Sequence, residues 1–76
     1  MHDTPRIFIG ATTFHVTGMG SPECARAVLV EVRAVHGVLQ VTADLLSSTI
    51  TVRASEPVDR ADIARAVRRV GHAVTP

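Results

Sequence analysis

The stretch TGMGSPECA, residues 17–25, decides how this 76-residue chain folds, because an alternating apolar run ends there and a helical pattern begins. Ser21 suits the N-cap of a helix and Pro22 its first position, so Cys24 falls at the third helical position. Unpartnered backbone N–H groups and the positive end of the helix dipole favour the thiolate form of a cysteine placed there. The alternative is that Cys24, the only cysteine, simply packs beneath the loop.

The composition excludes several kinds of protein. The length is that of one small domain with a modest core, which disfavours a large substrate cavity. Phe8 and Phe14 are the only aromatic residues, so we expect no sheet on which nucleic-acid bases stack. Eight basic and seven acidic residues nearly balance, which gives no nucleic-acid or membrane-binding patch. The lone cysteine and the absence of a signal peptide or long apolar run predict a cytoplasmic protein without direct membrane insertion.

Alternation of apolar and polar residues predicts the strands. We expect residues 1–10 to form a partly ordered tail and residues 11–76 to form the domain, although residues 7–9 could extend the first strand. The first strand covers residues 11–17. The second and third strands, at residues 39–44 and 49–53, are joined by a hairpin, and residues 72–74 form a short last strand.

Helical spacing of apolar residues predicts two helices. The first begins at Pro22 and ends near His36 and Gly37. The second has Asp59 as its cap and a hydrophobic staple from Val58 to Ile63, and it ends at Gly71. The order βαββαβ predicts an α+β, ferredoxin-like sandwich with two helices on one face of a four-stranded antiparallel sheet.

Five short motifs in this spacing point to a known family: FHVTGM (14–19), VHGV (35–38), VTADL (41–45), ITV (50–52) and AVRRVGH (66–72). Over residues 12–74 the chain resembles the heavy-metal-associated domain of copper chaperones and of the N-termini of metal-transporting P-type ATPases. The resemblance implies a metal-binding or metal-transfer domain, with such an ATPase or a related domain as its partner.

The binding motif of that family, Gly-Met-x-Cys-x-x-Cys, binds a soft cation such as Cu(I) through two thiolates. In this sequence the second cysteine is Cys24, but Ser21 stands where the first would be, and a hydroxyl is a poor ligand for a soft metal. In this fold the last strand lies antiparallel beside the first, which brings His72 next to the loop that begins at Gly18. A minority of bacterial members use a histidine at this position as a ligand. The resemblance therefore implies Cys24 and His72 as metal ligands, and the alternative is that His72 only fills a surface position.

Four other residues are weaker candidates. The alternation puts His15 on the open face of the sheet, where a solvated histidine is the simpler interpretation. Glu23 could offer oxygen to zinc, although a carboxylate in the first turn already stabilises a helix. His36 suits a capping role at the end of the first helix, and Met19 resembles the buried loop methionine of the family, which does not bind metal.

Coordination chemistry limits the choice of metal. Two ligands can hold Cu(I), whereas zinc normally takes four. We therefore expect Cu(I) ahead of zinc, which would need Glu23, water or a second molecule. A homodimer in which two Cys24 loops face each other would restore a pair of thiolates around one metal ion.

Three functional classes follow from these residues. The first is a metal-binding or metal-transfer domain that uses Cys24 and His72. The second is a degenerate family member that no longer binds metal and docks an acidic partner through Arg26, Arg65, Arg68 and Arg69. The third, an enzyme with a Cys24 nucleophile and a His72 base, is disfavoured because no oxyanion pocket, orienting acid or substrate cleft is evident.

Overall fold

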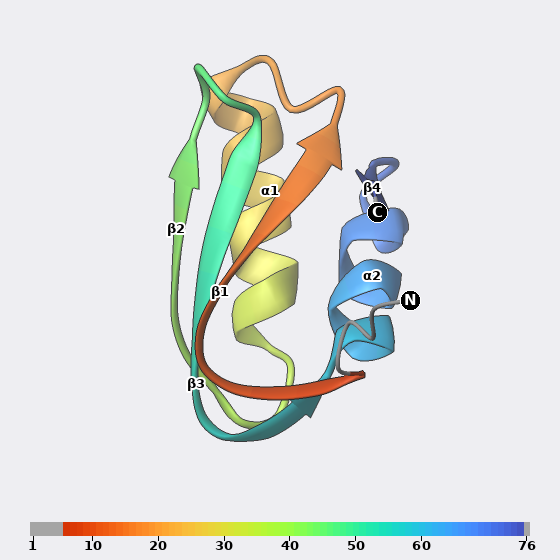
Figure 1. Cartoon of the computed structure of the whole chain (residues 1–76). Helices are drawn as coiled ribbons and strands as arrows, with labels where there is room; N and C mark the ends of the chain where they lie inside the picture. The colour runs from red at the N-terminus through yellow and green to blue at the C-terminus, as the bar shows by residue number, and fades with distance from the viewer. Residues whose placement is uncertain (1–5, 76) are drawn as a thin grey trace, which may run out of the picture.

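The fold is a four-stranded antiparallel sheet covered on one face by two helices, as expected from the sequence (Figure 1). The computed structural model describes residues 6–75, and the strand order in the sheet is β2-β3-β1-β4. The elements in chain order are β1 (Ile7–Thr17), α1 (Pro22–Arg33), β2 (Val38–Asp44), β3 (Thr49–Asp59), α2 (Arg60–Arg69) and β4 (Ala73–Thr75). Neither of the helices in the described chain is long and apolar enough to span a membrane.

Strand β1 begins at Ile7, earlier than the predicted start at Ala11. Ile7 and Phe8 pair with the end of β3, and the register shifts between Phe8 and Gly10. Gly10 has φ +86°, a conformation that glycine adopts readily, so the residue that looks like a break in the sequence instead marks an irregularity within the strand. Residues 7–10 of the expected tail therefore lie in the sheet, whereas residues 1–5 lie outside the described residues.

Other boundaries also differ from the predicted ones. Strand β2 begins at Val38, and β4 spans Ala73–Thr75, so His72 precedes the last strand and does not open it as expected. Helix α1 ends at Arg33 with Ala34 as its C-cap, before the expected end at His36. Gly37, at φ +95°, forms the turn into β2, where an added Cβ would lie 3.0 Å from Cγ2 of Val58. Strand β3 continues well past Arg53, since its distal end turns to pair with the start of β1.

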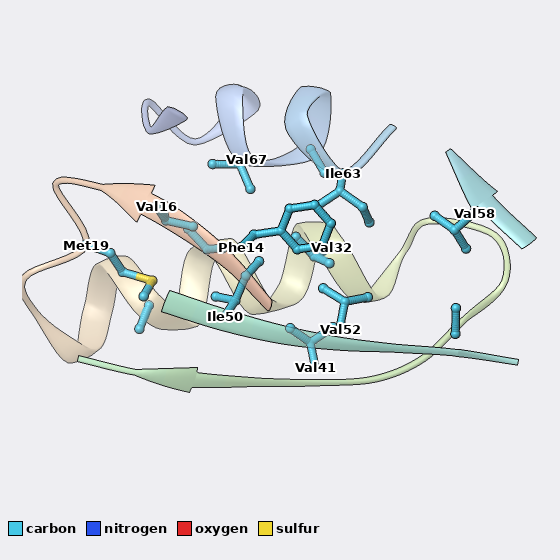
Figure 2. Packing of buried hydrophobic residues seen from close by; sticks show 14 of the residues in the cluster. Phe14, Val16, Met19, Val32, Val41, Ile50, Val52, Val58, Ile63 and Val67 are labelled. Carbon is cyan, nitrogen blue, oxygen red and sulfur yellow. The ribbon is translucent and has the colours of Figure 1, made fainter. Parts of the chain in front are cut away.

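The core lies between the sheet and the two helices (Figure 2). Phe14, Val16, Ile50 and Val52 come from the central strands β1 and β3 and are buried. Side chains of α1 and α2 close over them, among them Val28, Val32, Ile63 and Val67. The predicted cap of α2 is confirmed, because the Asp59 carboxylate accepts a hydrogen bond from the Ala61 amide at 2.8 Å. Packing rather than intrinsic propensity fixes these short helices on the sheet.

Phe8 tests whether the early part of β1 belongs to the folded unit. Its ring is 7% exposed and lies edge-on to Phe14, with 5.6 Å between the ring centroids. We expect Phe8→Ala to lower the free energy of unfolding by about 3 kcal/mol, because the truncation leaves a cavity in the core. Ile7→Ala is the matched control, since Ile7 is 48% exposed, and it should have a much smaller effect. Urea unfolding measures both, and equal small effects would contradict this assignment.

Candidate metal centre

The loop between β1 and α1 positions Cys24 in the first turn of the helix. Ser21 is the N-cap, and its side-chain oxygen accepts a hydrogen bond from the Cys24 amide at 3.2 Å. The Ala25 amide donates to the Ser21 carbonyl at 3.0 Å and starts the helical pattern. Cys24 is partly buried and packs against the core, so its thiol is neither sequestered nor fully exposed. The helix start predicted from Ser21 and Pro22 is confirmed.

The floor of the loop is apolar. Met19 is 1% exposed and points into the end of the core that lies beneath the loop (Figure 2). The Gly20 amide donates to the Gly18 carbonyl at 2.9 Å, which closes a tight turn around Met19. The expectation that Met19 packs beneath the site is therefore confirmed, and this packing anchors the loop from below.

The end of helix α2 fixes the backbone of His72. Gly71 adopts φ +87°, and its amide donates to the Arg68 carbonyl at 3.0 Å. The His72 amide donates to the Val67 carbonyl at 3.3 Å. This pair of bonds is the Schellman motif that ends many helices at a glycine. Because Gly71 ends the helix in this way, His72 leaves α2 in a defined direction.

The imidazole of His72 lies against the end of β1. Its Nδ1 atom is 2.9 Å from the carbonyl oxygen of Thr17. A carbonyl oxygen only accepts hydrogen bonds, so Nδ1 carries the proton and donates it. In the neutral ring Nε2 then keeps its lone pair, which is the form of histidine that binds metals. The hydrogen bond to Thr17 thus leaves one nitrogen available as a ligand.

Gly18 makes this contact possible. It has φ +73°, and a Cβ added there would lie 3.3 Å from Nδ1 of His72. A side chain at this position would strain the backbone and crowd the imidazole. The close approach of the His72 ring therefore depends on glycine at the first position of the loop.

The pairing of β4 with β1 brings the two predicted ligands to one end of the molecule. Thr17 pairs with Ala73 and Val16 with Val74, so the last strand lies antiparallel beside the first, as expected of this fold. His72 lies against Gly18, at the start of the loop after β1, and Cys24 lies in the helical turn after the same loop. His72 and Cys24 thus lie on either side of one short loop, at the end of the sheet where β1 meets α1.

The other candidates lie apart from this loop or have other partners. His15 is on the exposed face of the sheet, where its Nδ1 is 2.9 Å from the Thr75 hydroxyl. His36 is not a helix cap, because it lies beyond the end of α1 and its Nε2 is 3.0 Å from the Glu56 carboxylate. Glu23 is exposed in the first turn of α1, where it faces the positive end of the helix dipole.

Ser48 is a residue that sequence reasoning missed. It ends the turn between β2 and β3 with φ +58°, and its hydroxyl donates to the carbonyl of Val16. The Val16 amide in turn donates to the Ser48 carbonyl at 2.8 Å. Ser48 therefore ties the β2–β3 turn to the end of β1, one residue before the carbonyl that holds His72. No sequence signal marks this contact, because it depends on the approach of two distant segments.

The donor set supports a site of low coordination number. Within residues 6–75, no three side chains of histidine, cysteine, aspartate or glutamate gather as a set that could hold a metal ion. The Ser21 hydroxyl oxygen is engaged by the helix start. The Cys24 sulfur and the His72 nitrogen are the soft and borderline donors beside the loop, and the exposed Glu23 carboxylate lies in the same helical turn as Cys24. One soft thiolate and one imidazole fit Cu(I), which accepts two ligands, better than they fit zinc.

The sequence matches one family over most of its length. The family described as the heavy-metal-associated domain matches residues 13–73, and this chain belongs to that family. Its members are metal-binding or metal-transfer modules and are not enzymes. A comparison with curated proteins found no match.

Solved structures of the same fold include a metallochaperone and the N-terminal domains of two other proteins. The CopZ metallochaperone superposes with a TM-score of 0.81 at 21% identity, covering 87% of this chain and 100% of that one. The N-terminal domain of a potential copper-translocating P-type ATPase from Bacillus subtilis, in its Cu(I)-loaded state, superposes with a TM-score of 0.79 at 20% identity. The match covers 90% of this chain and 86% of that one. The apo N-terminal domain of ZntA superposes with a TM-score of 0.78 at 29% identity, and the match covers 87% of this chain and 89% of that one. The chain therefore has the architecture of copper chaperones and P-type ATPase N-terminal domains.

Gly18→Ala tests the contact between the loop and His72. We expect it to lower the free energy of unfolding by about 1–2 kcal/mol, because alanine is strained at a positive φ. It should also shift the His72 imidazole resonances in NMR spectra, since the new methyl group crowds Nδ1. Gly20→Ala is the matched control, because a Cβ there meets nothing within 4 Å and its φ is not in the left-handed range. Unchanged His72 resonances in Gly18→Ala would contradict the packing of the ring on Gly18.

Proposed function

We propose that this domain binds Cu(I) between the Cys24 thiolate and the Nε2 atom of His72, and passes the ion to a partner. The observation that carries the proposal is the hydrogen bond from His72 Nδ1 to the Thr17 carbonyl. Metal-binding histidines almost always donate their other ring N–H to a carbonyl or carboxylate, which fixes the ring and its tautomer. His72 has such a partner at the edge of the loop that leads to Cys24.

The helix-capping role of Ser21 supports a second metal ligand from outside the usual motif. Its side chain caps α1 through the Cys24 amide, a role that serine fills well. A neutral hydroxyl binds a soft cation poorly, so Ser21 adds little to the affinity for Cu(I). His72 is then the donor that compensates for the missing thiolate, with weaker binding than two thiolates would give.

Transfer needs a site that a partner can reach. Cys24 and His72 are both partly buried, and Gly20 beside them is open to solvent. A partner that carries a second thiolate could approach the ion there and take over its ligands one at a time. Similar architecture in P-type ATPase N-terminal domains makes a metal-transporting P-type ATPase, or a related domain, the partner we favour, with the cytoplasm as the setting.

A second copy is another source of a thiolate. Two loops facing each other would bring two Cys24 side chains to one ion and form a metal-bridged homodimer. Zinc would require such additional ligands, because one thiolate and one imidazole leave half of its usual four positions unfilled.

The loss of one motif cysteine also favours a second candidate function, a docking module that binds no metal. Its predicted surface is the group of arginines on the two helices. Arg65 forms an ion pair with Asp62, and Arg69 lies 3.6 Å from Glu31, so part of this charge is already neutralised. These internal ion pairs make the arginines a weaker basis for function than the donors beside the loop.

Competition titration with Cu(I) under reducing conditions tests the proposed ligands. Cys24→Ala should remove binding, and His72→Ala should weaken it by at least about tenfold, which corresponds to one ligand. His15→Ala is the matched control, because this histidine lies on the open sheet face, and it should bind like the original chain. Equal Cu(I) binding by Cys24→Ala and the original chain would exclude the site, and no binding by the original chain would favour the docking module. A stoichiometry of one ion per two chains with a doubled mass would identify the homodimer.

Ser21→Cys tests the role of the missing thiolate by restoring it. We expect Cu(I) affinity to rise by more than about tenfold, because a thiolate is a far better soft ligand than a hydroxyl. The free energy of unfolding of the apo form should fall by about 1 kcal/mol, since cysteine caps a helix less well than serine. Ser21→Ala provides the control, with the same loss of stability and no gain in affinity. A Ser21→Cys variant that binds no tighter would contradict a metal site at this loop.

A further inference from the structure

Thr17 contacts two consecutive residues where the chain enters β4. Its backbone carbonyl oxygen lies 2.9 Å from Nδ1 of His72, and its side-chain hydroxyl donates to the Ala73 carbonyl at 3.2 Å. Any residue at this position could make the first contact, because every residue carries a backbone carbonyl. The second contact needs a side-chain hydroxyl. The identity of residue 17 therefore decides whether the Ala73 carbonyl is held by a side chain.

The two contacts restrain the same part of the chain. Thr17 is the partner of Ala73 in the register of β1 and β4, and His72 directly precedes Ala73. The side chain of a threonine has few rotamers, and a bonded hydroxyl selects one of them. Because this hydroxyl fixes Ala73 to Thr17, the imidazole one residue earlier stays within reach of the Thr17 carbonyl. The hydroxyl thus supports the hydrogen bond that leaves Nε2 of His72 free.

The shortness of β4 makes such a restraint important. Strand β4 pairs with β1 through three residues, and so short a strand is held weakly by its backbone pairing alone. The His72 amide donates to the Val67 carbonyl at 3.3 Å, which fixes the backbone before the ring but leaves the ring free to turn. The Thr17 hydroxyl adds a restraint at the point where the pairing ends and His72 begins.

The other proposed ligand has a hydroxyl of the same kind beside it. The Ser21 side-chain oxygen accepts a hydrogen bond from the Cys24 amide at 3.2 Å. A side-chain hydroxyl therefore binds the backbone at Cys24 and, through Thr17, one residue after His72. Hydrogen bonds that orient the ligands before the ion arrives strengthen metal binding, because less order has to be imposed on binding.

From these contacts we infer that Thr17 is a positioning residue for His72, and that its hydroxyl strengthens Cu(I) binding by holding the imidazole in place. Thr17 is not a ligand, and it acts through Ala73 and the orientation of the ring. The inference rests on the proposed function, since the position of His72 affects the affinity only if His72 binds the ion. The state of the ring can be measured without metal.

The first measurement uses the metal-free chain. Thr17→Val removes the hydroxyl and keeps the shape of the side chain. At about pH 8.5, where a histidine ring is neutral, the nitrogen chemical shifts of His72 give the ratio of the Nδ1-protonated to the Nε2-protonated form. We expect Thr17→Val to lower this ratio at least about threefold and Thr17→Ser, which restores a hydroxyl, to recover most of it.

Thr75→Val is the matched control. The Thr75 hydroxyl also bonds across β1 and β4, to Nδ1 and the carbonyl of His15, but at the far end of the pairing. Thr75→Val therefore removes a cross-strand hydroxyl of the same kind without touching the residues beside His72. It should leave the ratio of the two His72 forms unchanged.

The second measurement is a competition titration of the same variants with Cu(I) under reducing conditions. Thr17→Val should weaken binding about threefold to tenfold, the range expected for one hydrogen bond, and Thr75→Val less than about twofold. Thr17→Ser should bind nearly as well as the original chain. When His72→Ala is already present, Thr17→Val should weaken binding no further, because the group that it positions is gone.

Three results would show that the Thr17 hydroxyl only stabilises strand pairing, and each would overturn the inference. They are an unchanged ratio of the His72 forms in Thr17→Val, equal losses of affinity in Thr17→Val and Thr75→Val, and an undiminished effect of Thr17→Val when His72→Ala is present. If His72→Ala weakens binding and Thr17→Val does not, the inference fails and the proposed ligands stand. If His72→Ala does not weaken binding, the proposed function fails together with the link to Cu(I), and the ratio in the metal-free chain separately decides whether Thr17 positions the ring.

Discussion

The short pairing between β1 and β4 is the constraint on which the candidate metal centre depends. Val74 opposite Val16 and Ala73 opposite Thr17 fix the end of the chain beside the end of the first strand. The glycine turn after α2 then brings the His72 ring to the Thr17 carbonyl and over Gly18. Two residues far apart in the sequence thereby flank one loop. The rest of the sheet and its two helices hold these two strand ends in place.

Ser21 shows how one residue can serve the fold while weakening the site. As an N-cap it stabilises the helix that carries Cys24, and its oxygen is directed at the Cys24 amide. A cysteine at the same position would cap less well and bind soft metal far better. The proposed Cys24 and His72 pair should have an intermediate affinity for Cu(I), because one thiolate with an imidazole binds the ion less tightly than two thiolates. Looser binding shortens the time an ion stays bound, which suits transfer more than storage.

Local signals predicted most of the fold, and long-range contacts account for what they missed. Some helix ends are predicted by the chemistry of a single residue, as at Ser21, Asp59 and Gly71, so these boundaries follow from the sequence. The irregularity at Gly10 cannot be predicted from the sequence, because a glycine is equally compatible with a turn and with a kinked strand. Cys24 and His72 became candidate ligands through the resemblance to a family. The Thr17 carbonyl escaped notice because any residue there carries the same backbone oxygen.

Strand β4 links the position of His72 to the edge of the sheet. Three paired residues form a marginal strand, so the end of the chain is the part of the sheet that opens most easily. An ion held by the proposed ligands Cys24 and His72 would stabilise the pairing of β4 with β1, because His72 directly precedes β4. Thermodynamic coupling is reciprocal, so any interaction that stabilises this pairing would strengthen binding of the ion by the same factor.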